Sequence, residues 1–102
     1  MKRVVLLEEA VLDLEEARVF YERLEVGIGD YCVSRLLEAL TQLETIHGVH
    51  TRHFGCFRAL VRRFPFGIYY LNEAEAIRVV AILDLRRSPS WIHTEMDRRR
   101  AD

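Results

Sequence analysis

The chain has 102 residues, of which 50% are hydrophobic and 30% are charged, and its formal net charge is -1. This length supports one hydrophobic core, so we expect a single domain over residues 1–102, and the composition excludes a chain that is disordered throughout. No apolar run approaches the roughly 20 residues that cross a bilayer, which favours a cytoplasmic location.

The charges are divided unevenly between the two halves of the chain. Residues 1–50 carry ten acidic and five basic side chains, whereas residues 51–102 carry ten arginines and six acids, and Lys2 is the single lysine. Arginine binds carboxylate or phosphate through a permanently charged fork, whereas lysine has the pKa that is more readily lowered for acid and base chemistry. The basic half therefore indicates binding more than catalysis.

In the N-terminal half we expect one short strand followed by two amphipathic helices. Residues 4–7 form an apolar run that is typical of a strand. Apolar residues then recur at three- and four-residue steps over residues 10–24 and again over 28–46, with Gly27 and Gly29 at the break. Helices with so short a connection lie antiparallel and can both cover one face of a sheet. The acidic face of the first helix is expected to be solvated.

In the C-terminal half we expect a loop and then a three-stranded antiparallel meander. Residues 46–56 have no hydrophobic period and contain two glycines, which predicts a connecting loop. Residues 57–72 have the pattern of a hairpin with its turn at 64–67, and residues 77–85 have the composition of a buried strand. The sequence thus predicts an α+β fold with two layers.

After the third strand we expect only a short C-terminal segment. Pro89 prevents the strand from continuing, and residues 91–100 are expected to form a frayed helix or a flexible tail. The three arginines at 98–100 are interpreted as part of a solvated terminus, with residues 97–102 as a candidate disordered tail.

The cysteines and histidines do not form a recognisable motif. Cys32 and Cys56 match neither a CxxC motif nor paired metal ligands, so we expect free, partly buried thiols. His47, His50 and His53 are spaced by three, as some zinc ligands are, but the flanking glycines and the lack of a fourth ligand favour a solvated loop. We expect neither a bound metal nor a cofactor.

The candidate binding residues are arginines near the ends of the predicted strands. Arg58, Arg62 and Arg63 lie on the first arm of the hairpin, and Arg86 and Arg87 follow the third strand. If these strands are neighbours, their ends bring several guanidinium groups to one edge of the sheet, where they suit phosphate, nucleic acid or an acidic protein segment. The alternative is that these arginines form the solvated face of a half-covered sheet.

Four segments, in this order along the chain, carry a resemblance to a known family. They are Ala-Val-Leu-Asp-Leu at 10–14, the aromatic pair at 20–21, the Arg-Phe-Pro-Phe hairpin at 57–72, and the strand IRVVAIL followed by Arg-Ser-Pro and Trp91. They are similar to the A-x-x-D-L helix start, the helical aromatic pair, the "R…V…RFPY…I…Y" run and the closing "RxP…W" of the ParE/RelE toxin superfamily. These are small toxins of bacterial type II toxin–antitoxin systems.

The resemblance implies a toxin with an antitoxin partner, and it divides by branch. RelE-like members cut messenger RNA on the ribosome, and ParE-like members poison DNA gyrase. The RelE branch would place cations at positions 60 and 67, where this chain has Leu60 and Gly67. A ParE-like toxin that binds gyrase is therefore favoured, and an enzymatic activity is not. The alternatives are a ribosome-dependent mRNA endonuclease and an inactive binding module of the same fold.

The expected antitoxin has an acidic, partly disordered C-terminal segment that covers the arginines in a hetero-oligomer. The residues expected to bind the target or the antitoxin are Arg58, Arg62, Arg63, Arg86, Arg87 and Trp91. Two departures from the family pattern lie in the C-terminal segment. Asp84 stands where many relatives carry histidine, and the spacing from Pro89 to Trp91 is one residue short.

Overall fold

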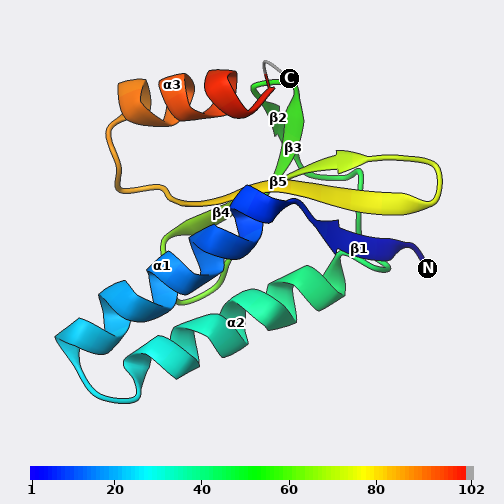
Figure 1. Cartoon of the computed structure of the whole chain (residues 1–102). Helices are drawn as coiled ribbons and strands as arrows, with labels where there is room; N and C mark the ends of the chain where they lie inside the picture. The colour runs from blue at the N-terminus through cyan, green and yellow to red at the C-terminus, as the bar shows by residue number, and fades with distance from the viewer. Residues whose placement is uncertain (101–102) are drawn as a thin grey trace.

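A five-stranded mixed sheet separates a pair of antiparallel helices from a third helix in the computed structural model, which describes residues 1–100 (Figure 1). The strand order is β1-β5-β4-β3-β2, with β1 parallel to β5 and the other neighbours antiparallel. The elements are β1 (Arg3–Leu6), α1 (Glu8–Leu24), α2 (Ile28–Gln42), β2 (Thr51–His53), β3 (Cys56–Leu60), β4 (Phe66–Asn72), β5 (Ala76–Asp84) and α3 (Pro89–Arg100).

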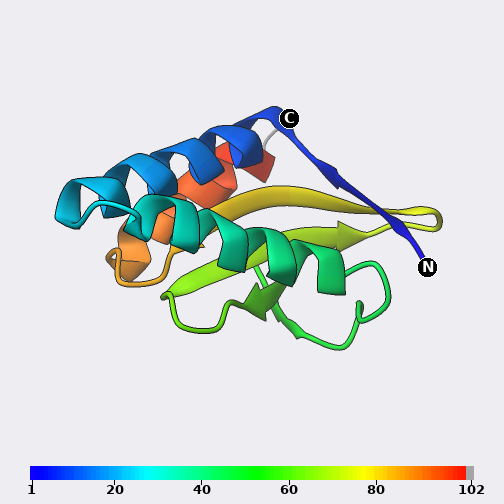
Figure 2. The ribbon, with the colours of Figure 1, turned by 90° about the horizontal axis from the view of Figure 1, so that it is seen from below.

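Helices α1 and α2 lie side by side over one face of the sheet (Figure 2). Their apolar stripes meet inward-facing residues of the strands in the larger core cluster, which includes Leu36 of α2 and Ile68 of β4. Gly29 permits the close approach of the two helices, because a Cβ atom there would lie 2.4 Å from the carbonyl oxygen of Arg18. The Glu22 carboxylate accepts hydrogen bonds from the Gly27 and Gly29 amides, so the start of α2 is capped from α1.

Helix α3 lies over the opposite face of the sheet. Ile92 and Met96, one turn apart, pack on a smaller cluster of β3, β4 and β5 residues. A β-bulge assists this arrangement, since Tyr69 pairs with Ala81 and Tyr70 pairs with Val79, which leaves Val80 as an extra residue in β5. As a result Val79 belongs to the helical-hairpin core, and Val80 contributes to the α3 core.

The predicted α+β class is confirmed, including the N-terminal strand, the helical hairpin and the antiparallel meander. Two local expectations are wrong. Residues 51–53 form strand β2 within the expected loop, because they pair with β3. Residues 98–100 belong to α3, which packs as a helix over the far face instead of extending as a solvated tail. The last two positions of the expected tail, 101 and 102, lie outside the described residues.

None of the helices within residues 1–100 combines the length and the apolar character needed to cross a membrane.

Candidate functional site

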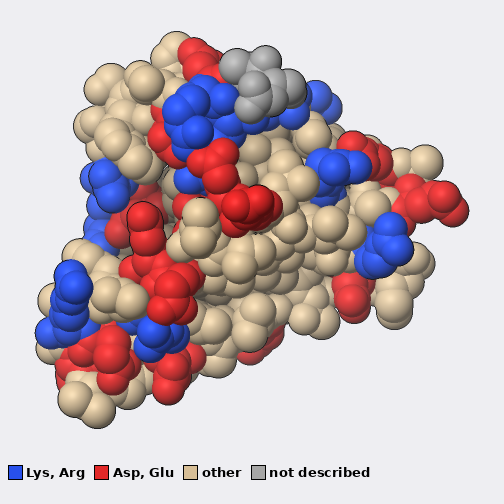
Figure 3. Space-filling view, in the orientation of Figure 1, with Lys and Arg blue, Asp and Glu red and all other residues tan. Residues whose placement is uncertain are grey.

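A groove of about 420 Å³ lies between α1 and α3. Acidic and basic residues face each other across it in the space-filling view (Figure 3). The residues that line it come from α1, from the end of β5 and from the start and outer face of α3: Glu9, Leu12, Asp13, Glu16, Ala17, Phe20, Phe66, Ile82, Leu83, Asp84, Arg87, Trp91, Glu95, Arg98 and Arg99.

The α1 wall of the groove is an amphipathic stripe. Leu12, Glu16 and Phe20 follow at four-residue spacing, so they share one face of the helix. Leu12 is 58% exposed and Phe20 is 50% exposed, although each is a large apolar side chain. On the opposite wall the Arg87 guanidinium lies 4.1 Å from the centroid of the Trp91 ring, a cation–π contact.

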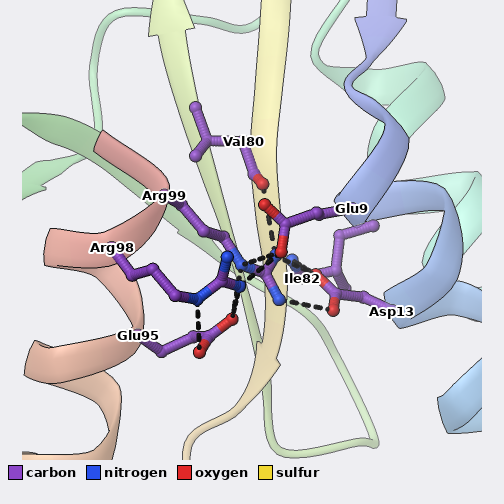
Figure 4. Close-up of polar contacts among 7 residues, drawn as sticks. All are labelled: Glu9, Asp13, Val80, Ile82, Glu95, Arg98 and Arg99. Atoms are coloured by element: carbon purple, nitrogen blue, oxygen red, sulfur yellow. Dashed lines mark hydrogen bonds and ion pairs between the residues drawn. The ribbon is translucent and has the colours of Figure 1, made fainter. Parts of the chain in front are cut away.

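The floor of the groove is the open edge of β5. Strand β1 pairs only with residues 76–79 of β5, so within residues 1–100 no strand lies along the edge beyond this point. The Ile82 amide donates to Asp13 Oδ2 at 2.9 Å, and the Val80 carbonyl accepts from Arg99 Nη1 at 3.3 Å (Figure 4). The two charged side chains thus satisfy backbone groups that a longer β1 would otherwise pair.

Asp13 and Arg99 form a bidentate ion pair that joins α1 to α3. The Arg99 Nη1 and Nη2 atoms lie 2.6 and 2.9 Å from the carboxylate oxygens of Asp13, and both side chains are 7% exposed. Burial acts to lower the pKa of Arg99, but the hydrogen bonds and charges of Asp13 and Glu95 more than offset it and raise this pKa. The bidentate contact lets each side chain compensate the buried charge of the other.

An outer layer of charges surrounds this pair. Glu95 accepts from Arg99 Nε at 2.8 Å and from Arg98 Nη2 at 2.6 Å, and these bonds lower the pKa of Glu95. Arg98 also pairs with Glu9 of α1 (Figure 4). The Arg98 side chain is exposed, so its pair with Glu9 is screened by water and holds α1 and α3 together more weakly than Asp13 and Arg99 do.

Of the six residues expected to bind a partner, Arg87 and Trp91 lie in the groove. Arg86 is already engaged, since it pairs with Asp84 at 2.8 Å and donates to the Tyr21 hydroxyl at 3.0 Å. The pKa of Asp84 is lowered because hydrogen bonds from Arg86 outweigh the opposing effect of burial. Arg86 therefore offers less free charge than its place in the sequence suggested.

The other three expected arginines lie on the sheet or in its hairpin connection. Arg58 is half-buried in β3, and Arg62 and Arg63 are exposed between β3 and β4. This connection lies beside the end of β5, because the Leu85 amide donates to the Pro65 carbonyl at 2.7 Å. The hairpin arginines and the segment after β5 therefore meet at one end of the sheet.

The three histidines at 47, 50 and 53, for which a solvated loop was expected, make separate hydrogen bonds. His50 Nδ1 lies 2.5 Å from the Tyr70 hydroxyl, and this hydroxyl also accepts a bond from the Gly48 amide. His47 bonds the Leu43 carbonyl, and His53 bonds Thr51. In the part of the chain that the structure describes, no three potential metal ligands are placed to hold one ion.

The two cysteines are free, as expected, and both are buried. Burial raises the pKa of the Cys32 thiol to about 11 and also raises that of Cys56, so both are protonated at neutral pH.

Sequence reasoning did not identify Asp13 and Arg99 as structural partners, although each carries a signal. Asp13 lies on the inner side of α1, three residues after Ala10 and four before Ala17, where an apolar residue is usual. Arg99 follows Ile92 and Met96 at helical spacing on the inner side of α3. An acid and a base at inward-facing positions of two helices are a signature of a buried ion pair.

No family model matches the sequence, and none of the curated proteins matches it. Among solved structures, one chain described as "Chromosomal ParDE TA system from P. aeruginosa" superposes with a TM-score of 0.72. The match covers 80% of this chain and 94% of that chain, with 18% sequence identity. This likeness confirms the expected ParE/RelE-like fold.

Proposed function

We propose that this chain is a ParE-like toxin of a bacterial type II toxin–antitoxin system, which arrests growth by binding DNA gyrase and is neutralised by a cognate antitoxin. The observation that carries the proposal is the fold shared with a chain of a ParDE toxin–antitoxin system over 94% of that chain. Such a toxin would act in the cytoplasm and form a hetero-oligomer with its antitoxin.

The surroundings of Arg58 support binding over RNA cleavage. Leu60 and Gly67 face each other across β3 and β4 and carry no charge. A Cβ atom at position 67 would lie 3.1 Å from Arg58 Cδ and 3.1 Å from a methyl group of Leu85, so there is little room for an arginine there without a shift of both neighbours. Few cations are then left on this face to stabilise a pentavalent phosphate or to move a proton.

The hairpin end of the sheet is our candidate for the surface that binds the target and an acidic segment of the antitoxin. Among residues 1–100, no carboxylate within ion-pairing distance neutralises Arg58, Arg62, Arg63 or Arg87, whereas Arg86 is paired with Asp84. Free guanidinium groups at one end of a sheet attract acidic chains and accelerate their association. Trp91 adds an exposed aromatic surface beside Arg87.

Inducible expression of the chain in a bacterial host tests the proposed activity. We expect filamentous cells with DNA damage while protein synthesis continues, and rescue by co-expression of the protein encoded in the adjacent reading frame. Arrest of translation before any DNA damage would instead indicate an mRNA endonuclease, and normal growth would indicate an inactive binding module.

The double variant Arg58→Ala/Arg87→Ala tests the proposed surface. We expect it to lose most of the growth arrest, because it removes two unpaired charges that would contact the target. Arg23→Ala is the matched control, since Arg23 is exposed at the far end of α1. Viable-cell counts and circular dichroism of the purified chains are the readouts. Full growth arrest by a folded double variant would contradict the assignment.

A further inference from the structure

We propose that the groove between α1 and α3 binds an amphipathic segment of the antitoxin whose apolar side chains are accompanied by a lysine or arginine opposite Glu16. The inference rests on the proposed function, because it assigns one part of the antitoxin to one surface of the toxin. This segment is additional to the acidic segment expected at the hairpin arginines, and Arg87 and Trp91 lie where the two surfaces meet.

The apolar part of the proposal rests on side chains exposed within a concave surface. Leu12 and Phe20 project from α1 into the groove, and Trp91, which is 36% exposed, lines the other wall. Ala17 and Phe66 form apolar surface between these walls. A partner that covers these side chains removes apolar surface from water at several points at once, which is typical of a groove that binds a helix or a peptide.

The charge of the partner follows from the charges that line the groove. Five carboxylates and three arginines line it, and of these arginines Arg87, which lies over the Trp91 ring, has no ion-pair partner within residues 1–100. Asp13, Glu9 and Glu95 are neutralised by Arg98 and Arg99, and Asp84 is neutralised by Arg86. Glu16 alone among these carboxylates has no ion-pair partner within residues 1–100, and it lies between Leu12 and Phe20 on the helix face. A cation flanked by apolar side chains complements this wall.

The floor of the groove indicates how the partner is recognised. An open strand edge usually invites a peptide to pair as an extra strand. Here the Ile82 amide and the Val80 carbonyl are already bonded to Asp13 and Arg99. The partner segment therefore cannot use these backbone groups unless the buried ion pair breaks, and we infer that it binds through side chains without lengthening the sheet.

Trp91 provides a direct readout because it is the only tryptophan in the chain. The probes are the full protein encoded in the adjacent reading frame and overlapping synthetic peptides that tile it. Added to the full-length toxin, the peptide that fills the groove should shift Trp91 emission to the blue in a saturable titration. Its sequence should contain apolar residues and at least one lysine or arginine.

Two pairs of variants locate the binding site. Glu16→Arg should weaken binding of that peptide roughly tenfold, and replacing the peptide's basic residue with glutamate should restore binding to this variant. Glu25→Arg is the control outside the groove. Leu12→Ser should also weaken binding, whereas Val11→Ser should not, since Val11 is 50% exposed on the same helix but does not line the groove.

The outcomes separate this inference from the proposed function. If the adjacent protein binds and rescues growth but Glu16→Arg and Leu12→Ser bind it with unchanged affinity, the groove assignment is wrong and the toxin proposal stands. Binding of only acidic peptides with no shift of Trp91 emission would overturn the assignment in the same way. If the adjacent protein neither binds nor rescues growth, the antitoxin part of the proposed function fails, and this inference fails with it.

Discussion

The two faces of the sheet are covered by different kinds of interaction. On the helical-hairpin face, fifteen buried residues form one apolar cluster, all of them in two helices and three strands except Leu43 and Val61, which directly follow α2 and β3. On the α3 face the buried cluster has seven residues, of which α3 supplies only Ile92 and Met96. The second face adds a buried ion pair between Asp13 and Arg99.

This difference shows how a short, mostly polar helix can occupy a defined position. Apolar burial is non-directional and tolerates small adjustments, whereas a bidentate ion pair fixes distance and orientation. Loss of either partner of a pair buried at 7% exposure is costly, because removal of Arg99 leaves Asp13 without an ion-pair partner among residues 1–100 and removal of Asp13 leaves Arg99 with only Glu95 and Glu9. On the helical-hairpin face the free energy of unfolding should therefore be sensitive to loss of side-chain volume. On the α3 face it should be sensitive to loss of one partner of the ion pair.

The largest expected effect comes from breaking the buried pair. Asp13→Ala should lower the free energy of unfolding by about 3–5 kcal/mol, because Arg99 would be left charged and buried. The double variant Asp13→Leu/Arg99→Met should recover most of that loss, since it removes both charges and keeps apolar volume. Urea unfolding measures both changes.

Arg98→Ala is the matched control for this experiment. Arg98 pairs with Glu9 of α1, but both side chains are exposed, so we expect a much smaller loss than for Asp13→Ala. Equal losses for Asp13→Ala and Arg98→Ala would show that burial of the inner pair has no special weight.

The next effect compares apolar truncation on the two faces. Leu36 and Met96 are both 0% exposed, so either change to alanine leaves a cavity, and Leu36→Ala should lower the free energy of unfolding by about 2–5 kcal/mol. We expect Leu36→Ala to speed amide exchange throughout the sheet, because its core joins both helices to the strands. Met96→Ala should speed exchange mainly in α3. Hydrogen exchange resolved by residue distinguishes them, and equal acceleration of β4 amides would contradict the proposed division.

The local patterns predicted the hairpin face well because its elements are stabilised along their own length. Regular three- and four-residue spacing predicted α1 and α2, although α2 ends at Gln42, before the expected 46. The alternation of Phe57, Ala59 and Val61 predicted a strand with one face toward the core. In each case residues close together in the sequence determine the type of element.

The α3 face was harder to predict because its determinants lie far apart in sequence. Only two buried apolar residues mark α3, and the charge that fixes it, Asp13, is separated from Arg99 by 86 positions. Strand β2 has three residues, too few to show alternation, and exists through its pairing with β3. Arg87 and Trp91 were expected to bind a partner, but the groove that contains them depends on the position of α3, so it could not be predicted.

The smallest expected effect is a pH dependence of the free energy of unfolding that arises from His50, in the loop before β2. The Tyr70 hydroxyl accepts from the Gly48 amide and shares a hydrogen bond with His50 Nδ1, and it donates to that nitrogen when Nδ1 carries no proton. Burial lowers the pKa of His50 below its ordinary value of 6.5. At a pH between the lowered pKa of folded His50 and the ordinary pKa of 6.5, the unfolded chain binds more protons than the folded chain. The free energy of unfolding therefore decreases as the pH falls below about 6.5.

His50→Gln should make this part of the pH dependence disappear. Urea unfolding of the two proteins on either side of pH 6.5 measures the difference, with exposed His93→Gln as the control. Identical pH profiles for the original chain and for His50→Gln would show that the bond to Tyr70 is not sensitive to protonation.

Because of the bulge at Val80, the faces to which the side chains of β5 point depend on the number of residues in the strand as well as on their types. Because successive side chains of a strand alternate between faces, one extra residue inverts the alternation for everything that follows. If the same residues alternated strictly, without the bulge, Ile82 would face α3; with the bulge, Val79 and Ile82 both face the helical hairpin. The extra residue thus sets which β5 side chains enter each of the two cores, the one under the helical hairpin and the one under α3.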